Sequence, residues 1–303
     1  MKKRVLILVM TLITAQLYAQ SVAFVNISSD PTYYSLGGAT LTADANAFSV
    51  SGNSSAIVFG EQKISAAASY GIWQPTGVND GIISLSGYGL LTDKIAVGLS
   101  GKYLLHQPYD IIGNDGTILK QYTPQDLSLE VGVAYKVIDG LSAGLNVRYI
   151  SSNLYEDAQG SAVAADLSLS YRLNGLRLAL AATNIGSKID YGYTPYNLPS
   201  MAKFGVGYAL NLNEKSTLSF NGECDYLINK GGLMAGLGAE FNYNKMVAAR
   251  VGFHYGDDNS IPTFASAGLG VKFAGVSLDA AYILGITDSP INGSMMISLG
   301  YSF

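Results

Sequence analysis

The histidines are the first residues to weigh for catalysis, because a nucleophilic serine needs a neighbouring base. The chain of 303 residues has two of them, His106 and His254. A serine hydrolase brings a serine, a histidine and an acid into register. Neither histidine lies in a recognisable motif with a nucleophilic serine. The sequence therefore predicts no catalytic residue, and we expect no enzyme.

Metal and nucleotide sites are the next candidates. Residues 114–116 (Asn-Asp-Gly) and 257–259 (Asp-Asp-Asn) are rich in the oxygen ligands that Ca²⁺ prefers. The same residue types favour turns, and this interpretation accounts for both clusters. Gly37-Gly38 follows no strand of a βαβ unit, so it is not a nucleotide loop. We therefore expect no metal and no cofactor.

Cysteine count and net charge narrow the class of protein further. Cys224 is the single cysteine, which excludes an internal disulfide and suggests an inert apolar role facing lipid. The formal charge of -4 includes the cations Lys2, Lys3 and Arg4 near the N-terminus. Without them the chain is more acidic, which disfavours nucleic acid as a partner.

Charged residues recur inside stretches in which apolar and polar residues alternate. Side chains on a strand point alternately to opposite faces, so these charges share one face with the small and polar residues. They carry both signs, which disfavours a strongly charge-selective pore. We interpret them as the paired lining of a lumen, and they include Glu130, Arg148, Asp166, Arg172, Glu223, Glu240 and Arg250.

Alternation extends over most of the chain and predicts the fold class. One face of residues 64–72 and one face of residues 295–303 are apolar at every second position. Charged residues are only 13% and mean hydropathy is +0.24. No run beyond the N-terminus reaches the roughly 18 apolar residues of a membrane helix. We predict an all-β, transmembrane, antiparallel β-barrel of about 14 strands, whose outer face contacts outer-membrane lipid.

The connections between the predicted strands alternate in length. Long polar loops such as residues 105–124 and 184–200 alternate with tight turns such as Asn174-Gly175 and Ala274-Gly275. In transmembrane barrels the short turns face the periplasm and the longer loops face outward. We therefore expect a location in the outer membrane with both termini in the periplasm.

The residues before the first predicted strand divide into two parts. A basic start, an apolar core and Leu17-Tyr18-Ala19 mark residues 1–19 as a secretory signal peptide. Residues 20–62 hold too much apolar surface to lie in water at low cost. We predict that they form a hatch in or under the lumen of a barrel built from residues 63–303. A periplasmic extension is the alternative.

Three stretches of this N-terminal part resemble the PorV/PorQ family of Bacteroidetes outer-membrane proteins. They read Phe24-Val25-Asn26-Ile27, Ser35-Leu36-Gly37-Gly38-Ala39 and Asp44-Ala45-Asn46-Ala47-Phe48. The family continues with an Asn-Pro-Ala element, where this chain has Asn53-Ser54-Ser55-Ala56 and lacks the proline. The resemblance implies a barrel of FadL-like architecture, with hatch residues Leu36, Gly37, Gly38, Asp44, Asn46, Phe48 and Asn53.

The same resemblance implies partners. PorV- and PorQ-like proteins work with the type IX secretion system, where they handle secreted cargo or pass it to an attachment complex. It also implies that Leu299, Tyr301 and Phe303, at the end of the chain, are a signal for the barrel-assembly machinery.

Two functions share this fold, so the fold alone does not separate them. The first is protein handling in type IX secretion, which a sealed lumen and partner-bound outer loops would favour. The alternative is a FadL-like channel for small hydrophobic molecules, which an apolar cavity between hatch and wall would favour. The facing of the strands is testable: Leu167→Arg on the lipid face should destabilise by roughly 2–4 kcal/mol, and Ser168→Arg on the lumen face much less.

Overall fold

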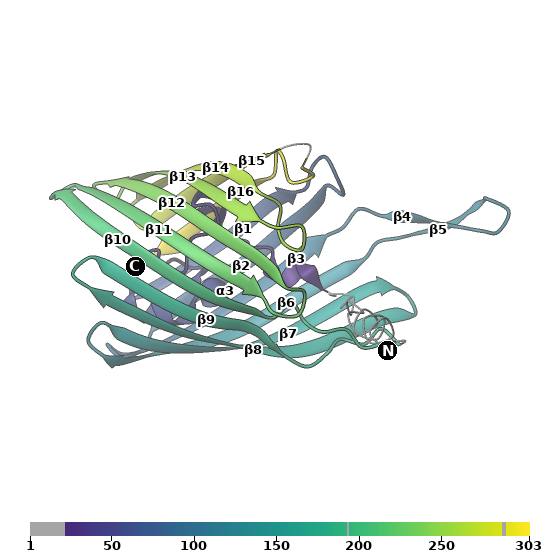
Figure 1. The fold of residues 1–303 in the computed structure, drawn as a ribbon, viewed down its shortest axis with the longest axis horizontal. Coiled ribbons are helices and arrows are strands. Elements are labelled where there is room, and N and C mark those ends of the chain that lie inside the picture. Colours follow the sequence, from purple (N-terminus) through teal and green to yellow (C-terminus); the bar gives the residue numbers. More distant parts are fainter. Residues whose placement is uncertain (1–21, 193, 287–288) are drawn as a thin grey trace, which may run out of the picture.

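Fourteen strands close into an antiparallel barrel within the residues that the structure describes (Figure 1). The computed structural model describes residues 22–192, 194–286 and 289–303, so the predicted signal peptide lies outside them. The wall runs through β1 (Ile64–Trp73), β2 (Asp80–Leu90), β3 (Ile95–Leu105), β6 (Gln125–Ile138), β7 (Leu141–Tyr155), β8 (Ala158–Leu173), β9 (Leu176–Gly186), β10 (Met201–Asn213), β11 (Ser216–Leu227), β12 (Gly232–Tyr243), β13 (Val247–Gly256), β14 (Phe264–Phe273), β15 (Val276–Gly285) and β16 (Met295–Ser302).

The last strand closes the barrel against the first. Ala68 lies opposite Leu299 in the β1–β16 pair. Ile64 and Phe303 exchange backbone hydrogen bonds of 2.9 and 3.0 Å. Each described wall strand therefore has a neighbour on both sides, which removes the exposed edges that open sheets carry. The predicted fold class, a closed antiparallel barrel of about 14 strands, is confirmed.

Alternation places apolar side chains outside and polar ones inside. Leu99, Val131 and Leu269 are 64%, 59% and 64% exposed on the outer face. Ser100 and Glu130, the next residues along β3 and β6, are buried on the inner face. An apolar outer belt is what contact with lipid requires. None of the described helices has the length and apolar character to cross a membrane.

The barrel has two unlike ends, which we call the turn end and the loop end. At the turn end, tight turns such as Asn174-Gly175 join the strands, with φ of 48° and 88°. Positive φ at both central residues gives the hairpin turn that matches strand twist, and asparagine and glycine tolerate it best. At the loop end the connections are longer, and one of them carries a two-stranded hairpin.

That hairpin consists of β4 (Tyr109–Ile112) and β5 (Ile118–Tyr122) and joins β3 to β6. Its strands pair with each other, Tyr109 opposite Tyr122, and form a sheet separate from the wall. Figure 1 shows it standing away from the loop end, far beyond the other connections. The sequence predicted only a long polar loop here.

Residues 22–60, which we call the luminal segment, run lengthwise through the barrel. They contain η1 (Ala23–Asn26), α2 (Pro31–Ser35), α3 (Ser49–Gly52) and η2 (Ser54–Phe59). Val22 packs at the loop end with Ile189 and Ile291, whereas Gly60 lies against Tyr88 near the turn end.

The two ends of the described chain therefore lie at opposite ends of the barrel. Val22 is at the loop end, and Phe303 is paired at the turn end. The placement of both termini on the periplasmic side stays a prediction, because residues 1–21 lie outside the described residues. An even number of strands fixes where β1 begins and β16 ends, but it does not fix the course of the chain before β1.

Candidate functional site

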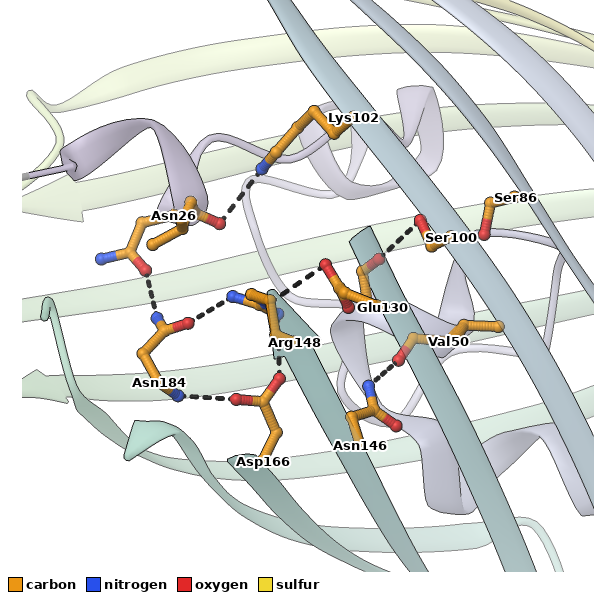
Figure 2. A network of polar contacts seen from close by, with 12 residues as sticks. Asn26, Val50, Ser86, Ser100, Lys102, Glu130, Asn146, Arg148, Asp166 and Asn184 are labelled. Carbon is orange, nitrogen blue, oxygen red and sulfur yellow. Dashed lines mark hydrogen bonds and ion pairs between the residues drawn. The ribbon is translucent and has the colours of Figure 1, made fainter. Parts of the chain in front are cut away.

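A buried arginine organises the polar interior (Figure 2). Arg148 of β7 contacts Glu130 of β6 through Nε, at 3.1 Å from Oε1, and Asp166 of β8 through Nη2, at 2.9 Å from Oδ2. All three side chains are buried. Strand order brings them together, because β7 lies between β6 and β8 and Glu130 is directly opposite Arg148. A buried charge is tolerated when it is paired, and Arg148 is paired with two carboxylates here.

A bulge in the wall connects this arginine to the luminal segment. The β8–β9 register shifts between Ala165 and Leu167, and Asn184 on β9 has a φ of 57°. The extra residue turns Asn184 inward. Its backbone nitrogen donates to Asp166 Oδ1 at 2.6 Å, and its side-chain oxygen accepts from Arg148 Nη1. Its Nδ2 donates to Asn26 Oδ1 of the luminal segment at 2.7 Å.

Lys102 of β3 holds the first turn of the luminal segment. Its ammonium donates to the carbonyl oxygens of Phe24, Val25 and Ile27, at 2.9, 3.1 and 2.6 Å. A lysine has three N–H donors, and each has an acceptor here. Alternation along β3 predicts that Lys102 points inward, but it predicts neither the partners of Lys102 nor the role of Asn184, because these partners lie far away along the chain and leave no local pattern.

Serines and glycines of the wall form a close-fitting seat for the rest of the segment. Asn53 donates through Nδ2 to Ser170 Oγ at 2.9 Å, and Ser142 Oγ donates to the carbonyl oxygen of Ser55 at 2.7 Å. Opposite, a Cβ atom on Gly252 would overlap the backbone nitrogen of Gly37, and one on Gly238 would overlap Leu36. Glycine is required where two backbones approach this closely.

The remaining predicted hatch residues contact the wall or one another. Leu36 and Phe48 are buried, and the carbonyl oxygen of Gly37 lies 3.2 Å from His254 Nδ1. Gly37 and Gly38 have φ of 64° and 84°, in the left-handed region. Asn46 caps the turn before α3, since its Oδ1 accepts from the backbone nitrogen of Phe48 at 2.9 Å.

The remaining predicted charges also form pairs inside the barrel. Asp44 of the luminal segment lies 2.9 Å from Arg177 and 3.7 Å from Arg172. Glu223 lies 2.7 Å from Lys203 and accepts from the backbone nitrogen of Leu41 at 2.7 Å. Arg250 lies 2.5 Å from Glu240 and 2.8 Å from Asp279. Several of these contacts join wall and luminal segment, as the resemblance to a hatch implies.

A small cavity of mixed lining lies inside the barrel. It has a volume of about 90 Å³, extends between luminal segment and wall from exposed Asp44 to buried Lys102, and is also lined by Asp30, Lys203, Leu41 and Phe48. This volume holds several water molecules. Sites for small apolar ligands are usually larger, roughly 300 Å³ or more, with mainly apolar walls. The cavity therefore suits water better than a hydrophobic molecule.

An apolar cluster, which we call the mouth cluster, lies between this cavity and the loop end. Its buried members come from the luminal segment, from the outer loops and from the wall strands, and they include Val22, Phe24, Val25, Ile189, Leu198 and Ile291. Trp73, the single tryptophan, belongs to the same cluster and its ring lies 5.5 Å from that of Tyr34. Among the described residues, these side chains fill the loop end of the lumen with apolar groups.

His106 and Ser142, which could be considered for catalysis, take part in other contacts. His106 Nδ1 lies 2.9 Å from Asp80 Oδ2, and Nε2 lies 2.9 Å from Asp126 Oδ2. With a carboxylate at each nitrogen, the ring has no nitrogen left to activate a serine. Residues 140–144 have the spacing Gly-x-Ser-x-Gly, but Ser142 is fully buried at the start of β7 and bonds Ser55. That is no strand-to-helix elbow with an exposed nucleophile.

The oxygen-rich clusters form turns. Asp115 Oδ1 accepts from the backbone nitrogen and hydroxyl of Thr117, at 3.1 and 2.7 Å. Asp257 accepts from the backbone nitrogens of Leu233 and Asn259, at 2.7 and 3.0 Å. In the part of the chain that the structure describes, no group of three or more acidic, histidine or cysteine side chains is placed to hold a metal ion.

The residues of the implied assembly signal lie on the outer face of the closing strand. Leu299, Tyr301 and Phe303 are exposed, and the rings of Tyr301 and Phe303 lie 6.0 Å apart. Cys224 is exposed on the same apolar face of the wall.

Comparison with known proteins adds a family and a fold. A family model described as type IX secretion system protein PorV matches residues 13–231. Among solved structures, the chain is similar to the CymD monoaromatic hydrocarbon channel, at 14% identity over 94% of this chain and 99% of that one, with a TM-score of 0.62. It is also similar to the P. putida toluene transporter TodX, at 11% identity over 89% and 97%, with a TM-score of 0.64.

A third similar structure is a Pseudomonas aeruginosa FadL homologue, at 12% identity over 91% of this chain and 98% of that one, with a TM-score of 0.53. At such identities the likeness shows a shared fold and no shared function. No curated protein sequence matches this chain.

Proposed function

This chain belongs to the PorV family of type IX secretion system proteins, and from that membership we propose that it is an outer-membrane docking barrel. In this role it binds proteins of the type IX pathway, either secreted cargo or partner subunits, at its loop end. The barrel anchors that binding surface in lipid. The observation that carries the proposal is the combination of a filled lumen with a projecting apolar hairpin.

The filled lumen favours binding over passage. The luminal segment is seated against wall glycines and serines, the mouth cluster places apolar side chains across the loop end, and the cavity of about 90 Å³ is small and lined by polar as well as apolar groups. The alternative, a channel for small hydrophobic molecules, needs a continuous apolar path. Wall pairing leaves no gap for a side exit among the described strands. The likeness to TodX and CymD supports the alternative only through the fold.

The hairpin offers a surface for a protein. Ile112, Ile118 and Leu119 are 65%, 62% and 66% exposed, on an element that stands well beyond the wall (Figure 1). Clustered apolar side chains exposed to water mark interaction sites. The free edges of β4 and β5 could also accept an added strand from a partner. Both features suit an extended, partly apolar stretch of polypeptide.

Orientation follows from the two unlike ends. Transmembrane barrels place short turns in the periplasm and long loops outside. On this basis the hairpin and Val22 face the cell exterior, and Phe303 faces the periplasm. The closing strand, with Leu299, Tyr301 and Phe303 exposed, would then be presented to assembly machinery on the periplasmic side.

Retention of partners by hairpin variants tests the proposal. We expect the triple change Ile112→Ser, Ile118→Ser and Leu119→Ser to remove most type IX subunits or cargo that copurify with the tagged protein from native outer membranes. Truncation of a hot-spot side chain costs about 2 kcal/mol or more, so we expect retention to fall at least about tenfold. Val78→Ser is the matched control, because Val78 is 53% exposed in another loop at the same end.

Undiminished copurification with the triple variant would exclude the hairpin as the docking surface. A bound hydrocarbon or fatty acid in place of any protein partner would exclude the docking function and favour the channel.

A further inference from the structure

Three ionisable side chains meet at the root of the hairpin. His106 follows β3, the strand from which the hairpin leaves the wall, and Asp126 lies in β6, the strand to which it returns. Asp80 begins β2 on the other side of β3. His106 therefore points inward between the ends of its two flanking strands. Through Asp126 it ties one leg of the hairpin to the other, and through Asp80 it ties both to the wall.

The geometry favours a protonated ring. Both nitrogens face a carboxylate oxygen at 2.9 Å, Nδ1 toward Asp80 and Nε2 toward Asp126. A ring that carries a proton on each nitrogen donates to both carboxylates, whereas a neutral ring donates to only one of them. The imidazolium is therefore the form that best satisfies this site. Asp80 Oδ1 also accepts from the backbone nitrogen of Gln107 at 3.3 Å, so the first residues of the hairpin leg are held as well.

A second brace supports the hairpin further from the wall. The Tyr109 hydroxyl donates to the carbonyl oxygen of Leu154 at 2.8 Å, and Lys120 Nζ lies 2.6 Å from Glu156. The rings of Tyr122 and Tyr155 lie 5.4 Å apart. These contacts to the β7–β8 connection are exposed, and exposed pairs contribute little each. The more buried joint at the root is the stronger of the two supports.

We propose that His106 is the positioning residue of the hairpin: as an imidazolium between Asp80 and Asp126 it fixes the angle at which β4–β5 stands on the barrel, and loss of its proton removes one of the two hydrogen bonds and loosens the hairpin. The inference rests on the proposed function in one respect only, namely that the hairpin docks a protein. Holding the hairpin in one direction lowers the conformational entropy that a partner must otherwise remove on binding.

The direction of the pH effect follows from the surroundings. Hydrogen bonding to Asp126 and the charge of Asp80 raise the pKa of His106 above its ordinary value, against the opposing effect of partial burial. The charged groups that face the ring are Asp80 from β2 and Asp126 from β6; the next charged side chains further inside are Lys102 on β3 and Glu130 on β6. A raised pKa means that the clamp is complete below the ordinary histidine pKa. It is lost as pH rises through the folded-state value.

Distance measurements between two spin labels test the joint in the mature protein in lipid bilayers. With Cys224→Ser as background, labels at Asn114→Cys on the hairpin tip and Asp258→Cys on another outer loop report the hairpin angle. We expect a narrow distance distribution at pH 6 that broadens at alkaline pH. His106→Gln should be broad at both pH values. His106→Arg, which keeps a fixed charge and donors for both carboxylates, should stay narrow at both.

Two controls separate the joint from its alternatives. His254→Gln changes the other histidine and should keep the pH response. A response that persists in His106→Gln, or a narrow distribution in that variant at alkaline pH, overturns the proposal. So does a broad distribution in His106→Arg.

Partner retention separates this inference from the proposed function. We expect His106→Gln to retain type IX partners about tenfold less well, because the freed hairpin must be ordered again on binding. The Ile112, Ile118 and Leu119 triple variant should lose partners while its label distances stay narrow. If that triple variant retains its partners, the hairpin is not the docking surface, and the label distances still decide the joint on their own. If the label distances are the same in the unaltered protein and in His106→Gln, the proposed role of His106 is wrong and the docking function is unaffected.

Discussion

Neighbouring residues of one strand meet different surroundings on the two sides of the wall. Leu167 of β8 is 55% exposed on the lipid face. Leu167→Arg should lower the free energy of unfolding by about 2–4 kcal/mol, because arginine is costly near the middle of the bilayer. Leu212→Arg is the matched control: Leu212 is also 55% exposed but lies beside the turn end, where about 0–1 kcal/mol is expected. Urea unfolding in lipid vesicles measures both, and equal losses would contradict the assigned membrane depth.

Ser168 lies on the other side of the same strand, where we predict a smaller cost for Ser168→Arg than for Leu167→Arg. The side chain does not face open water there. Ser168 Oγ lies 3.2 Å from Ser54 Oγ and accepts from the backbone nitrogen of Ser55 at 3.0 Å. An arginine there must displace the luminal segment, and overpacking of this kind costs about 1–3 kcal/mol. Alternation predicts which way a side chain points, but not what it meets.

For the charged residue Arg148, too, the sequence predicts the direction of the side chain but not its partners. Its inward direction follows from the sequence, because Val147 and Tyr149 on either side are apolar. Its partners follow from strand register, which places Glu130 opposite it, and from a bulge that turns Asn184 inward. Neither register nor bulge position is encoded in a short stretch of β7. Removing one member of such a buried group typically costs about 3–5 kcal/mol. Strand pairings that would separate these side chains are therefore disfavoured.

Among elements, the seat of the luminal segment gives the sharpest structural test. Gly252→Ala should destabilise the barrel by about 1–3 kcal/mol, because a Cβ atom there overlaps the backbone of Gly37. Gly222→Ala is the matched control, since a Cβ atom on Gly222 meets Leu237 at an ordinary 3.5 Å. Thermal unfolding followed by heat-dependent gel mobility distinguishes them. Equal stability of the two variants would mean that the segment is not seated against β13.

The strands were predictable from sequence and the hairpin was not. A period of two, repeated across the chain with turn residues between, identifies wall strands without any partner being known. The β4–β5 hairpin has a weaker signal, namely two short β-branched runs around Asp115-Gly116, which was interpreted as loop chemistry. Its root is less predictable still, because Asp80, His106 and Asp126 come from three separate strand ends.

For the molecule as a whole, the mouth cluster predicts a barrel that does not conduct. Burial of Ile189, Leu198 and Phe24 separates the polar cavity from the loop end. We expect purified protein in planar lipid bilayers to show no steady ion current. Ile189→Asp with Leu198→Asp should open a current by admitting water to the cluster. Val78→Asp, at an exposed position of the same end, serves as the control, and a steady current through the unaltered protein would contradict a sealed mouth.

The path of the chain before β1 has a consequence for the order of assembly. The luminal segment fills the space that the strands enclose, and the β1–β16 seam completes that enclosure. Once the seam has formed, the segment can enter only endwise, and Phe24 and Val25 must then pass the inward polar side chains of the wall to reach the loop end. Entry is far easier while β1 and β16 are still apart. We therefore expect the luminal segment to be in place before the barrel closes. Pairing of β1 with β16 is then the step that encloses it.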